Sequence, residues 1–276
     1  MSISARTLWY IESHLSNELS LDEIALATGV SRFHLSRAFS LTVAQTISGY
    51  VRARRLSHAA LALAAGAENI LDVALAAGYG SHEAFTRAFC AQFGTTPEQV
   101  RARKSTHGLA LQEALRMSVP NSSKLEAPRI VRDGPRRLFG LAQRCQGNAG
   151  IPTLWDRFVP HLGAIAEQIG NVTYGVMYDS DESGVNFTYA CAVEVRAFPA
   201  QPKEFARIEL PARSYAVWPH RGHASSVGAT CAAIFSHGLA QAKLEPLHEP
   251  MFERYDEAFD PRTGNGGLEV WVPVKG

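Results

Sequence analysis

Phe33, Ser36 and Arg37 are spaced three and four residues apart in the segment SRFHLSRAF, and on a helix this spacing brings them to one side. A shorter helical pattern over residues 21–28 precedes them and ends at Gly29, a residue that terminates helices. Two short helices around a glycine turn predict a helix-turn-helix, whose second helix can enter the major groove of DNA. We therefore expect the side chains on this face to contact bases.

A second candidate for a functional site is a pair of residues near the end of the chain, in the segment LEVWVPV. Leu268, Val270 and Val272 alternate with Glu269 and Trp271, as in a strand that is covered on one face. If the apolar residues face the helices of this region, a carboxylate and an indole point to the other side. A buried carboxylate needs a counter-charge, and an aromatic face attracts cations. The pair predicts a receptor for a lipophilic cation or an amphipathic molecule; the alternative is a Glu269 in water beside a partly buried Trp271.

The helix-turn-helix pattern occurs twice along the chain. Its matching pieces are ALATG and ALAAG (25–29 and 74–78), SRFHLSRAF and SHEAFTRAF (31–39 and 81–89), and VRAR (51–54 and 100–103). The second copy has one extra residue in its turn, Gly80, and an alanine- and leucine-rich helix expected over residues 46–65 connects the two copies. One such helix pair can be a fragment of a helical core, but two pairs with the same turn and the same arginine predict two DNA-binding units.

Residues 4–105, including the closing segment GYGSHEAFTRAFCAQFGTTPEQVR, resemble the DNA-binding domain of the AraC/XylS family of bacterial transcription regulators. The resemblance implies that both recognition helices of one subunit enter successive major grooves of a bipartite operator on double-stranded DNA. Most members of the family are activators, and the resemblance suggests RNA polymerase as a further partner. The positions that contact bases in the family correspond to Arg32, Phe33, Ser36 and Arg37 in the first helix and to His82, Glu83, Thr86 and Arg87 in the second.

Within this set, Arg37 and Arg87 are the strongest candidates. A guanidinium group can bond the O6 and N7 atoms of guanine together, which is worth about 1–3 kcal/mol of discrimination. Phe33 can contact a thymine methyl group. Glu83 has two open interpretations, because it can accept a hydrogen bond from cytosine N4 or stabilise the N-terminus of its own helix. Ser36 is smaller than the polar residue of many relatives, so we expect the first helix to contact fewer bases directly.

Beyond residue 129 the helical periodicity gives way to short alternating or apolar runs that predict strands. The predicted strands are 137–144, 173–179, 187–196, 204–218, 251–255 and 268–274, with helical patterns over 152–169 and 224–242 between them. We predict an α+β chain with an N-terminal all-α double helix-turn-helix domain. The C-terminal α/β domain should contain two ββαβ-type repeats, read along the chain as β-α-β-β twice, with an antiparallel sheet and the helices on one face.

Residues 129–275 resemble the GyrI-like effector-binding domain. The segments that carry the resemblance are PTLWDRF, YAVWPHRGHASSVGATCAAIF and the closing FERYDEAFDPRTGNGGLEVWVPVKG. Related domains sense multidrug cations and other small molecules through an acidic residue in an aromatic cage, and the resemblance assigns that role to Glu269. It implies a small hydrophobic effector, with cations among the candidates. The aromatic residues it nominates are Trp155, Tyr174, Tyr189, Trp218, Tyr255 and Trp271.

The chain of 276 residues is long enough for two domains. We divide it into a DNA-binding domain (1–107), a linker (108–128) and an effector domain (129–276), and the pattern over 107–124 predicts a helical fragment that ends at Pro120. Residues 1–107 hold 10 Arg and Lys against 8 Asp and Glu, a net of +2, although the whole chain has a net charge of only +1. The amino-terminal arginines lie where phosphates are expected to approach.

Several other functions lack the residues that they need. No run reaches the roughly 18–20 apolar residues of a membrane span, and no signal-peptide pattern is seen, so we expect a cytoplasmic protein without membrane partners. The four cysteines are widely separated, which predicts free thiols and no zinc site. His220 and His223 have no third ligand at metal spacing, and no glycine-rich nucleotide motif occurs, so we expect no metal and no other cofactor.

An enzyme is the main alternative interpretation. Some GyrI-like domains resemble hydrolases in which a buried glutamate is the general base. A hydrolase, or a ligand-sequestering domain, fused to a DNA-binding module would carry the same Glu269 and Trp271. Because no second acid or base is placed beside them, we expect the chain not to be an enzyme.

Overall fold

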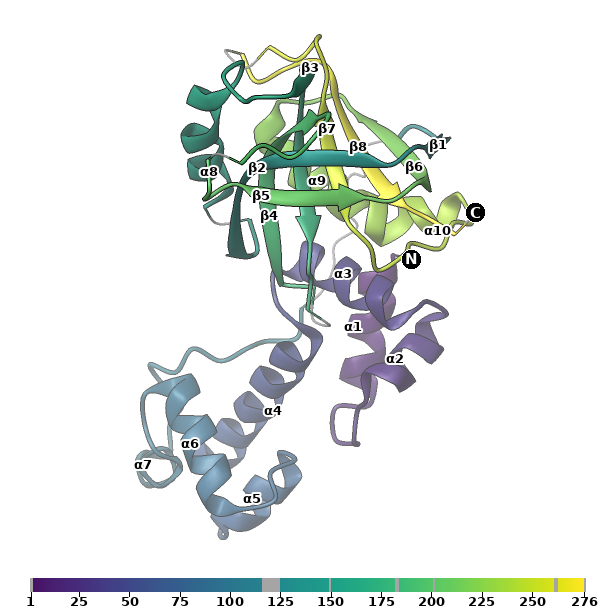
Figure 1. Ribbon diagram of the computed structural model, residues 1–276. Coiled ribbons are helices and arrows are strands. Elements are labelled where there is room, and N and C mark those ends of the chain that lie inside the picture. The colour runs from purple at the N-terminus through teal and green to yellow at the C-terminus, as the bar shows by residue number, and fades with distance from the viewer. Residues whose placement is uncertain are drawn as a thin grey trace. The chain divides into compact units, whose positions relative to one another are not determined.

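The computed structural model describes residues 2–115, 125–148, 150–181, 184–200, 202–260 and 263–275. Its contacts divide the chain into two compact units (Figure 1). The first unit consists of residues 3–32 and the described residues from 45 to 115, and the second of residues 33–44 and those from 125 onward. The division falls within the first helix-turn-helix, whose second helix belongs by its contacts to the C-terminal unit.

The first unit is helical, as predicted. Its helices are α1 (Ile3–Ser13), α2 (Leu21–Thr28), α4 (Ile47–Ala64), α5 (Ile70–Ala76), α6 (His82–Phe93) and α7 (Pro97–Arg103), whereas α3 (Arg32–Val43) lies in the second unit from Phe33 onward. Side chains cap several N-termini by accepting a backbone N–H, and such a cap is worth about 1 kcal/mol. These capping residues are Ser20, Thr46, Asn69, Ser81 and Thr96. The predicted glycine turn is confirmed at Gly29, which ends α2 with a φ of 70°.

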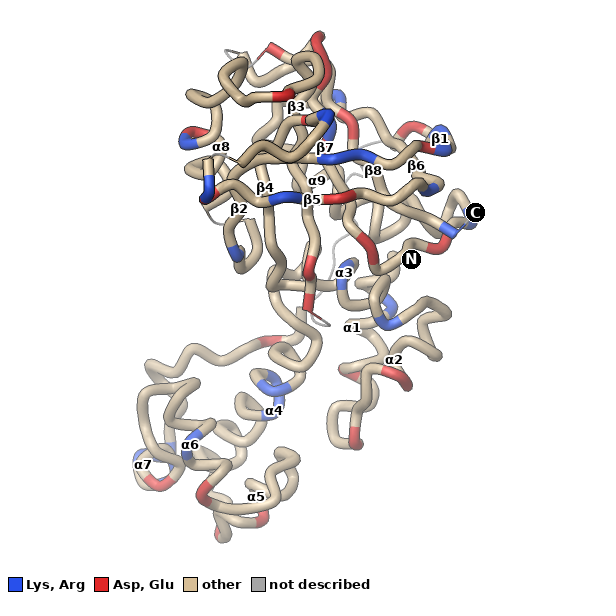
Figure 2. The backbone as a smooth tube through the Cα atoms, in the orientation of Figure 1, with Lys and Arg blue, Asp and Glu red and all other residues tan. Residues whose placement is uncertain are grey.

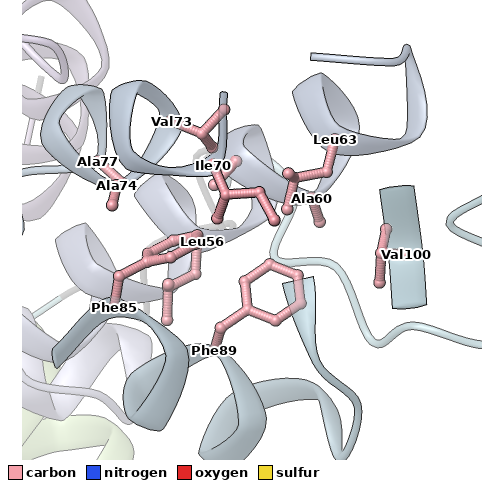
Figure 3. Packing of buried hydrophobic residues seen from close by; sticks show 11 residues of the cluster. Leu56, Ala60, Leu63, Ile70, Val73, Ala74, Ala77, Phe85, Phe89 and Val100 are labelled. Carbon is pink, nitrogen blue, oxygen red and sulfur yellow. The ribbon is translucent and has the colours of Figure 1, made fainter. Parts of the chain in front are cut away.

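The second helix-turn-helix is formed by α5 and α6, which share one hydrophobic core with α4 and α7 (Figure 3). Phe85 and Phe89 of α6 are fully buried there against Leu56 and Leu63 of α4. The residues four apart on α6 therefore face the core, because side chains at this spacing lie on one side of a helix. This leaves the opposite side of α6 available to DNA.

The predicted helical fragment after residue 107 is wrong over 107–115, and residues 116–124 lie outside the described residues. Residues 107–115 instead run as an irregular segment along α4. The N–H of Gln112 donates to Ser57 Oγ at 2.8 Å, and the N–H of Leu115 donates to the Tyr50 hydroxyl at 3.0 Å. Backbone donors that bond to side chains of α4 are not available for a helix of their own.

The C-terminal part of the second unit is an eight-stranded antiparallel sheet with the order β1-β6-β8-β7-β3-β4-β2-β5. The strands are β1 (Arg129–Asp133), β2 (Arg136–Gln146), β3 (Gln168–Tyr178), β4 (Asn186–Val195), β5 (Ala206–Leu210), β6 (Arg213–His220), β7 (Met251–Tyr255) and β8 (Leu268–Pro273). Its helices are α8 (Ile151–Phe158) and a continuous helical run of α9 (Val227–Ala233), a π-helical turn (Ile234–Gly238) and α10 (Leu239–Gln241).

The sheet contains the predicted duplication, with more strands than predicted. The elements β1-β2-α8-β3-β4 and β5-β6-α9-β7-β8 occupy equivalent positions in the sheet. If each strand is replaced by its counterpart in the other repeat, the result is the same strand order read from the opposite edge. The predicted strand 204–218 is two strands, β5 and β6, separated by Pro211 and Ala212. The predicted helix 152–169 ends early because Pro160 cannot donate an N–H and Gly163 adopts a left-handed φ of 78°. Each repeat is therefore ββαββ.

Both faces of the sheet are buried. One face forms a core that includes Tyr215 and Trp271 as well as Ile208 and Leu210 of β5, which is at the other end of the strand order. Because strands from opposite ends of the order meet in one core, the sheet curls on itself (Figure 1). The helices α8 and α9 cover the other face, so the prediction that the helices lie on one face is confirmed. We call these the inner face and the helix-covered face.

Candidate ligand pocket and DNA-contacting helices

A buried carboxylate lies on the helix-covered face, and it is Glu253 of β7. Met251, Glu253 and Tyr255 alternate with Phe252 and Arg254 along this strand, so the first three share a face. The residue Glu253 is only 5% exposed. Sequence reasoning placed a strand here but did not select its glutamate, although an acidic residue between Met and Tyr on one face was a visible signal.

Two tyrosine side chains bond this carboxylate and an indole contacts both of them, and we call the four residues the Glu253 cage. The hydroxyls of Tyr189 and Tyr255 each donate to Glu253 Oε2 at 2.8 Å. The indole N–H of Trp155, on α8, donates to the Tyr189 hydroxyl at 3.2 Å, and its ring meets that of Tyr255 edge-on at 5.1 Å between centroids. Strands β4 and β7 and helix α8 thus converge on one carboxyl group.

The electrostatics of the Glu253 cage follow from its burial. Burial raises the pKa of the Glu253 carboxyl above its ordinary value, while the hydroxyls of Tyr189 and Tyr255 and the charge of Arg37 act in the opposite direction. Burial also raises the pKa values of both tyrosines far above the usual range, so their hydroxyls keep their protons and act as donors. The two tyrosine hydroxyls therefore stabilise the ionised Glu253 carboxylate by hydrogen bonding, and a cation beside this buried charge would stabilise it further.

A cavity of about 580 Å³ opens beside this region of the second unit. Met177 and Met251, at the ends of β3 and β7, line it, and so do the acidic residues Asp179, Glu209 and Glu249. A volume of this size is typical of small-molecule sites. Arg37 and Arg207 also line it, so the cavity has thioether walls with side chains of both charges around them.

Glu269 and Trp271, the predicted ligand pair, lie on the opposite face of β8, as the strand alternation predicted. Trp271 is buried in the inner core, where its ring stacks on Phe252 at 5.2 Å between centroids. The Glu269 side chain is 19% exposed and accepts hydrogen bonds from Arg129 Nη2 at 2.6 Å and from the Trp271 indole N–H at 3.1 Å. The Nη1 atom of Arg254 lies 3.9 Å from Glu269 Oε2. This carboxylate already has two cationic neighbours.

The other nominated aromatic residues divide between the two faces. Trp155, Tyr189 and Tyr255 belong to the Glu253 cage. Tyr174 lies in the inner core, where its hydroxyl donates to Glu194 at 3.3 Å, and Trp218 is fully buried on the helix-covered face. The structure therefore brings three of the six together around one carboxylate, and that carboxylate is not Glu269.

The second predicted DNA-contacting helix, α6, presents its polar side to solvent. Glu83 and Arg87 are exposed, and His82 and Thr86 are half-buried. His82 Nε2 lies 3.1 Å from Glu98 Oε1 at the start of α7. Backbone and Ser81 hydrogen bonds lower the pKa of Glu83, which favours its role at the helix N-terminus.

The first predicted DNA-contacting helix, α3, is different. Arg32 is exposed, with a 3.6 Å contact to Asp22, and Phe33 is half-buried. Ser36 and Arg37 are buried. Two of the four predicted contact residues on this helix are thus inaccessible in this structure.

The histidine pair considered for metal binding has other partners. His220 Nδ1 lies 2.8 Å from Thr230 Oγ1 and its Nε2 lies 3.0 Å from the carbonyl of His223, while His223 Nδ1 lies 2.7 Å from Ser225 Oγ. Within the described part of the chain, no group of three or more His, Cys, Asp or Glu side chains is arranged to hold a metal ion. No helix among the described residues is long and apolar enough to cross a membrane.

Paired helix-turn-helix units and a curled sheet with a buried carboxylate cage define the class, a DNA-binding regulator with a small-molecule binding domain. Residues 126–275 match the GyrI-like small molecule binding domain, and residues 12–103 match a helix-turn-helix domain. The chain belongs to the GyrI-like family and carries an AraC-type helix-turn-helix domain, so it is a transcription regulator and not an enzyme.

Among similar proteins, the transcriptional regulator Rob of Salmonella typhimurium is 28% identical over 97% of this chain and 96% of that protein. The right origin-binding protein of Escherichia coli K12 is 41% identical over 40% of this chain, which is 38% of that protein. The structure of SAV2435 bound to tetraphenylphosphonium covers 55% of this chain at 21% identity, with a TM-score of 0.45.

Proposed function

We propose that this regulator activates transcription and that a lipophilic cation bound at Glu253 controls its binding to DNA. The observation that supports a cationic ligand is a buried carboxylate that accepts hydrogen bonds from two tyrosine hydroxyls, with an indole beside them. Burying an anion without a cation is unfavourable, and aromatic faces attract cations. A permanent cation would therefore favour the ionised form of Glu253 and gain from the rings around it.

Glu253 replaces Glu269 as the proposed ligand carboxylate on physical grounds. Glu269 is partly in water and has Arg129 and Arg254 as neighbours, so a guest cation would have to compete with both. Glu253 lies among aromatic and thioether groups, where the attraction between charges is screened less than in water.

For DNA binding, we propose a bipartite operator whose two half-sites are contacted by α3 and α6. The proposed contact residues are Arg32, Phe33, Ser36 and Arg37 on α3 and His82, Glu83, Thr86 and Arg87 on α6. The spacing of one helical turn and the recruitment of RNA polymerase are proposals that rest on the family resemblance.

The experiment is a calorimetric titration of the full chain with tetraphenylphosphonium, a permanent cation with an apolar surface, and with its anionic isostere tetraphenylborate. Glu253→Gln keeps the shape of the side chain and removes its charge, and Glu269→Gln is the matched control on the inner face. We expect the cation to bind the wild type, and Glu253→Gln to weaken binding by at least about tenfold, or about 1.4 kcal/mol. Glu269→Gln should change the affinity by less than about twofold, in keeping with a partly exposed charge.

The reverse pattern, with a large loss in Glu269→Gln and none in Glu253→Gln, would return the ligand site to the position predicted from the sequence. Equal affinity of the wild type for cation and anion would remove charge from the recognition altogether.

A further inference from the structure

Arg37 of α3 is buried inside the small-molecule domain. The residue is 2% exposed, and its guanidinium group lies over the rings of Phe187 and Phe235 at 5.2 and 5.9 Å from their centroids. Its Nη2 lies 2.9 Å from Met177 Sδ and 3.8 Å from Met251 Sδ. This is the environment expected for a bound lipophilic cation, with aromatic faces and polarisable sulfur around the charge.

Other residues of α3 fix the helix at this place. His34 Nε2 lies 2.8 Å from the carbonyl oxygen of Phe235, and the ring of Phe33 stacks on His248 at 4.6 Å between centroids. The carbonyl of Gly184 accepts hydrogen bonds from Arg37 Nη1 at 3.1 Å and from Ser40 Oγ at 3.3 Å. These contacts engage the same side of α3 that was predicted to enter the major groove.

The Arg37 site is continuous with the Glu253 cage. Met251 precedes Glu253 by two residues on the same face of β7, and such neighbours are about 7 Å apart along a strand. Met177 lies two residues after Gly175 on β3, and Gly175 is paired with Glu253 across the sheet. The charges of Arg37 and Glu253 act on each other, since each shifts the other's pKa toward its ionised form. Arg37 also lines the 580 Å³ cavity, together with Met177 and Met251.

We propose that Arg37 is an internal cationic ligand of the small-molecule domain, and that an external lipophilic cation displaces it and releases α3 for DNA binding. The proposal rests on the proposed function, because it uses the same carboxylate as the cation site. It adds a mechanism. We call the arrangement with Arg37 against Phe187 and Phe235 the closed state, and the arrangement with α3 released the open state. One guanidinium group cannot lie against these two rings and also bond a guanine base, so the closed state excludes base contact by Arg37.

The size of the effect follows from the population of the closed state. If closed molecules outnumber open ones by about ten to one, an external cation binds about tenfold more weakly than it would to the open domain alone. Removing the internal ligand should therefore strengthen cation binding. A loss of contacts elsewhere in the domain would weaken it, so the sign of the change separates competition from a structural role.

The test is hydrogen exchange by mass spectrometry on the full chain, followed in peptides over residues 33–43, with and without tetraphenylphosphonium. We expect the cation to accelerate exchange in these peptides of the wild type, and tetraphenylborate to have no effect. Arg37→Gln should show fast exchange before any addition and bind the cation about tenfold more tightly. Arg157→Gln, which removes an exposed arginine from α8, should behave as the wild type. Glu253→Gln should abolish the response to the cation.

A second variant tests the helix contact without removing a charge. A side chain at Gly184 would approach the Cα of Arg37 to 3.3 Å at a left-handed φ of 68°, so Gly184→Ala should also loosen α3. Equal cation affinity in the wild type and Arg37→Gln, with exchange over 33–43 unchanged on binding, would overturn this inference and leave the proposed function standing. Failure of the cation to bind the wild type and Arg37→Gln alike would overturn both.

Discussion

Gly175 of β3 lies directly opposite Glu253 of β7, and its missing side chain is what leaves room for the Glu253 cage. A Cβ at this position would lie 2.8 Å from Cζ of Tyr189 and 2.9 Å from Glu253 Oε2, both closer than real Cβ contacts. The duplication explains the pairing, because β3 and β7 are equivalent strands that meet at the centre of the sheet. One repeat supplies the carboxylate and the other supplies the space for it.

Gly175→Ala should therefore damage the cage. Overpacking of this kind typically costs about 1–3 kcal/mol, and we expect a loss in that range from the free energy of unfolding, measured with urea. Binding of tetraphenylphosphonium should weaken as well, because Tyr189 must move. Gly134→Ala is the control, since a Cβ there meets nothing within 4 Å. Equal destabilisation by the two substitutions would show that the space beside Tyr189 is not special.

Glu253→Gln should change how stability depends on pH. The folded-state pKa of Glu253 is raised above its unfolded value, so the folded protein holds this proton more tightly, and the resulting stabilisation is lost as the pH rises through the folded-state pKa. Without ligand, the variant should be more stable than the wild type at pH 8, and the difference should shrink toward pH 5. Each unit of pKa displacement corresponds to about 1.4 kcal/mol. Urea denaturation at several pH values measures this, and a difference that does not vary with pH would contradict it.

Arg87→Ala should weaken binding to a specific operator by about 1–3 kcal/mol and leave the fold intact, because Arg87 is exposed on α6. The operator can be obtained by selecting bound duplexes from a random pool, and affinity can be measured by fluorescence anisotropy at fixed salt. Arg157→Ala, on α8, serves as the control for loss of one positive charge. An Arg87→Ala protein with wild-type affinity would remove this residue from the proposed contacts.

The four cysteines should differ in reactivity. All are free thiols; Cys90 is half-buried, whereas Cys145, Cys191 and Cys231 are buried. Burial raises the pKa of Cys231 to about 12, so this thiol stays protonated and unreactive at neutral pH. We expect Ellman's reagent to modify Cys90 alone in the native protein and all four after unfolding. Cys90→Ser should abolish the native reaction, and rapid modification of the Cys90→Ser protein would show that the buried sites open readily.

The sequence by itself determined the type of most elements and the order of the two repeats, but not every boundary, since the predicted strand 204–218 is two strands and residues 107–115 form no helix. The repeated helix-turn-helix, the antiparallel domain built from two repeats and the alternation of Glu269 with Trp271 all follow from local periodicity. Periodicity decides which residues share a face, because side chains recur every 3.6 residues on a helix and every two on a strand. For the same reason it identified Phe33, Ser36 and Arg37 as one side of α3.

Only the tertiary structure decided what covers each face. Glu253 is buried beside tyrosines of β4 and β7 and the indole of α8, while the Glu269 side chain, on the other face of the sheet, is 19% exposed. The side of α3 that looked free for DNA contains Arg37, which lies against residues about 140 to 214 positions away in the sequence. Burial depends on such distant neighbours, and a local pattern contains no information about them.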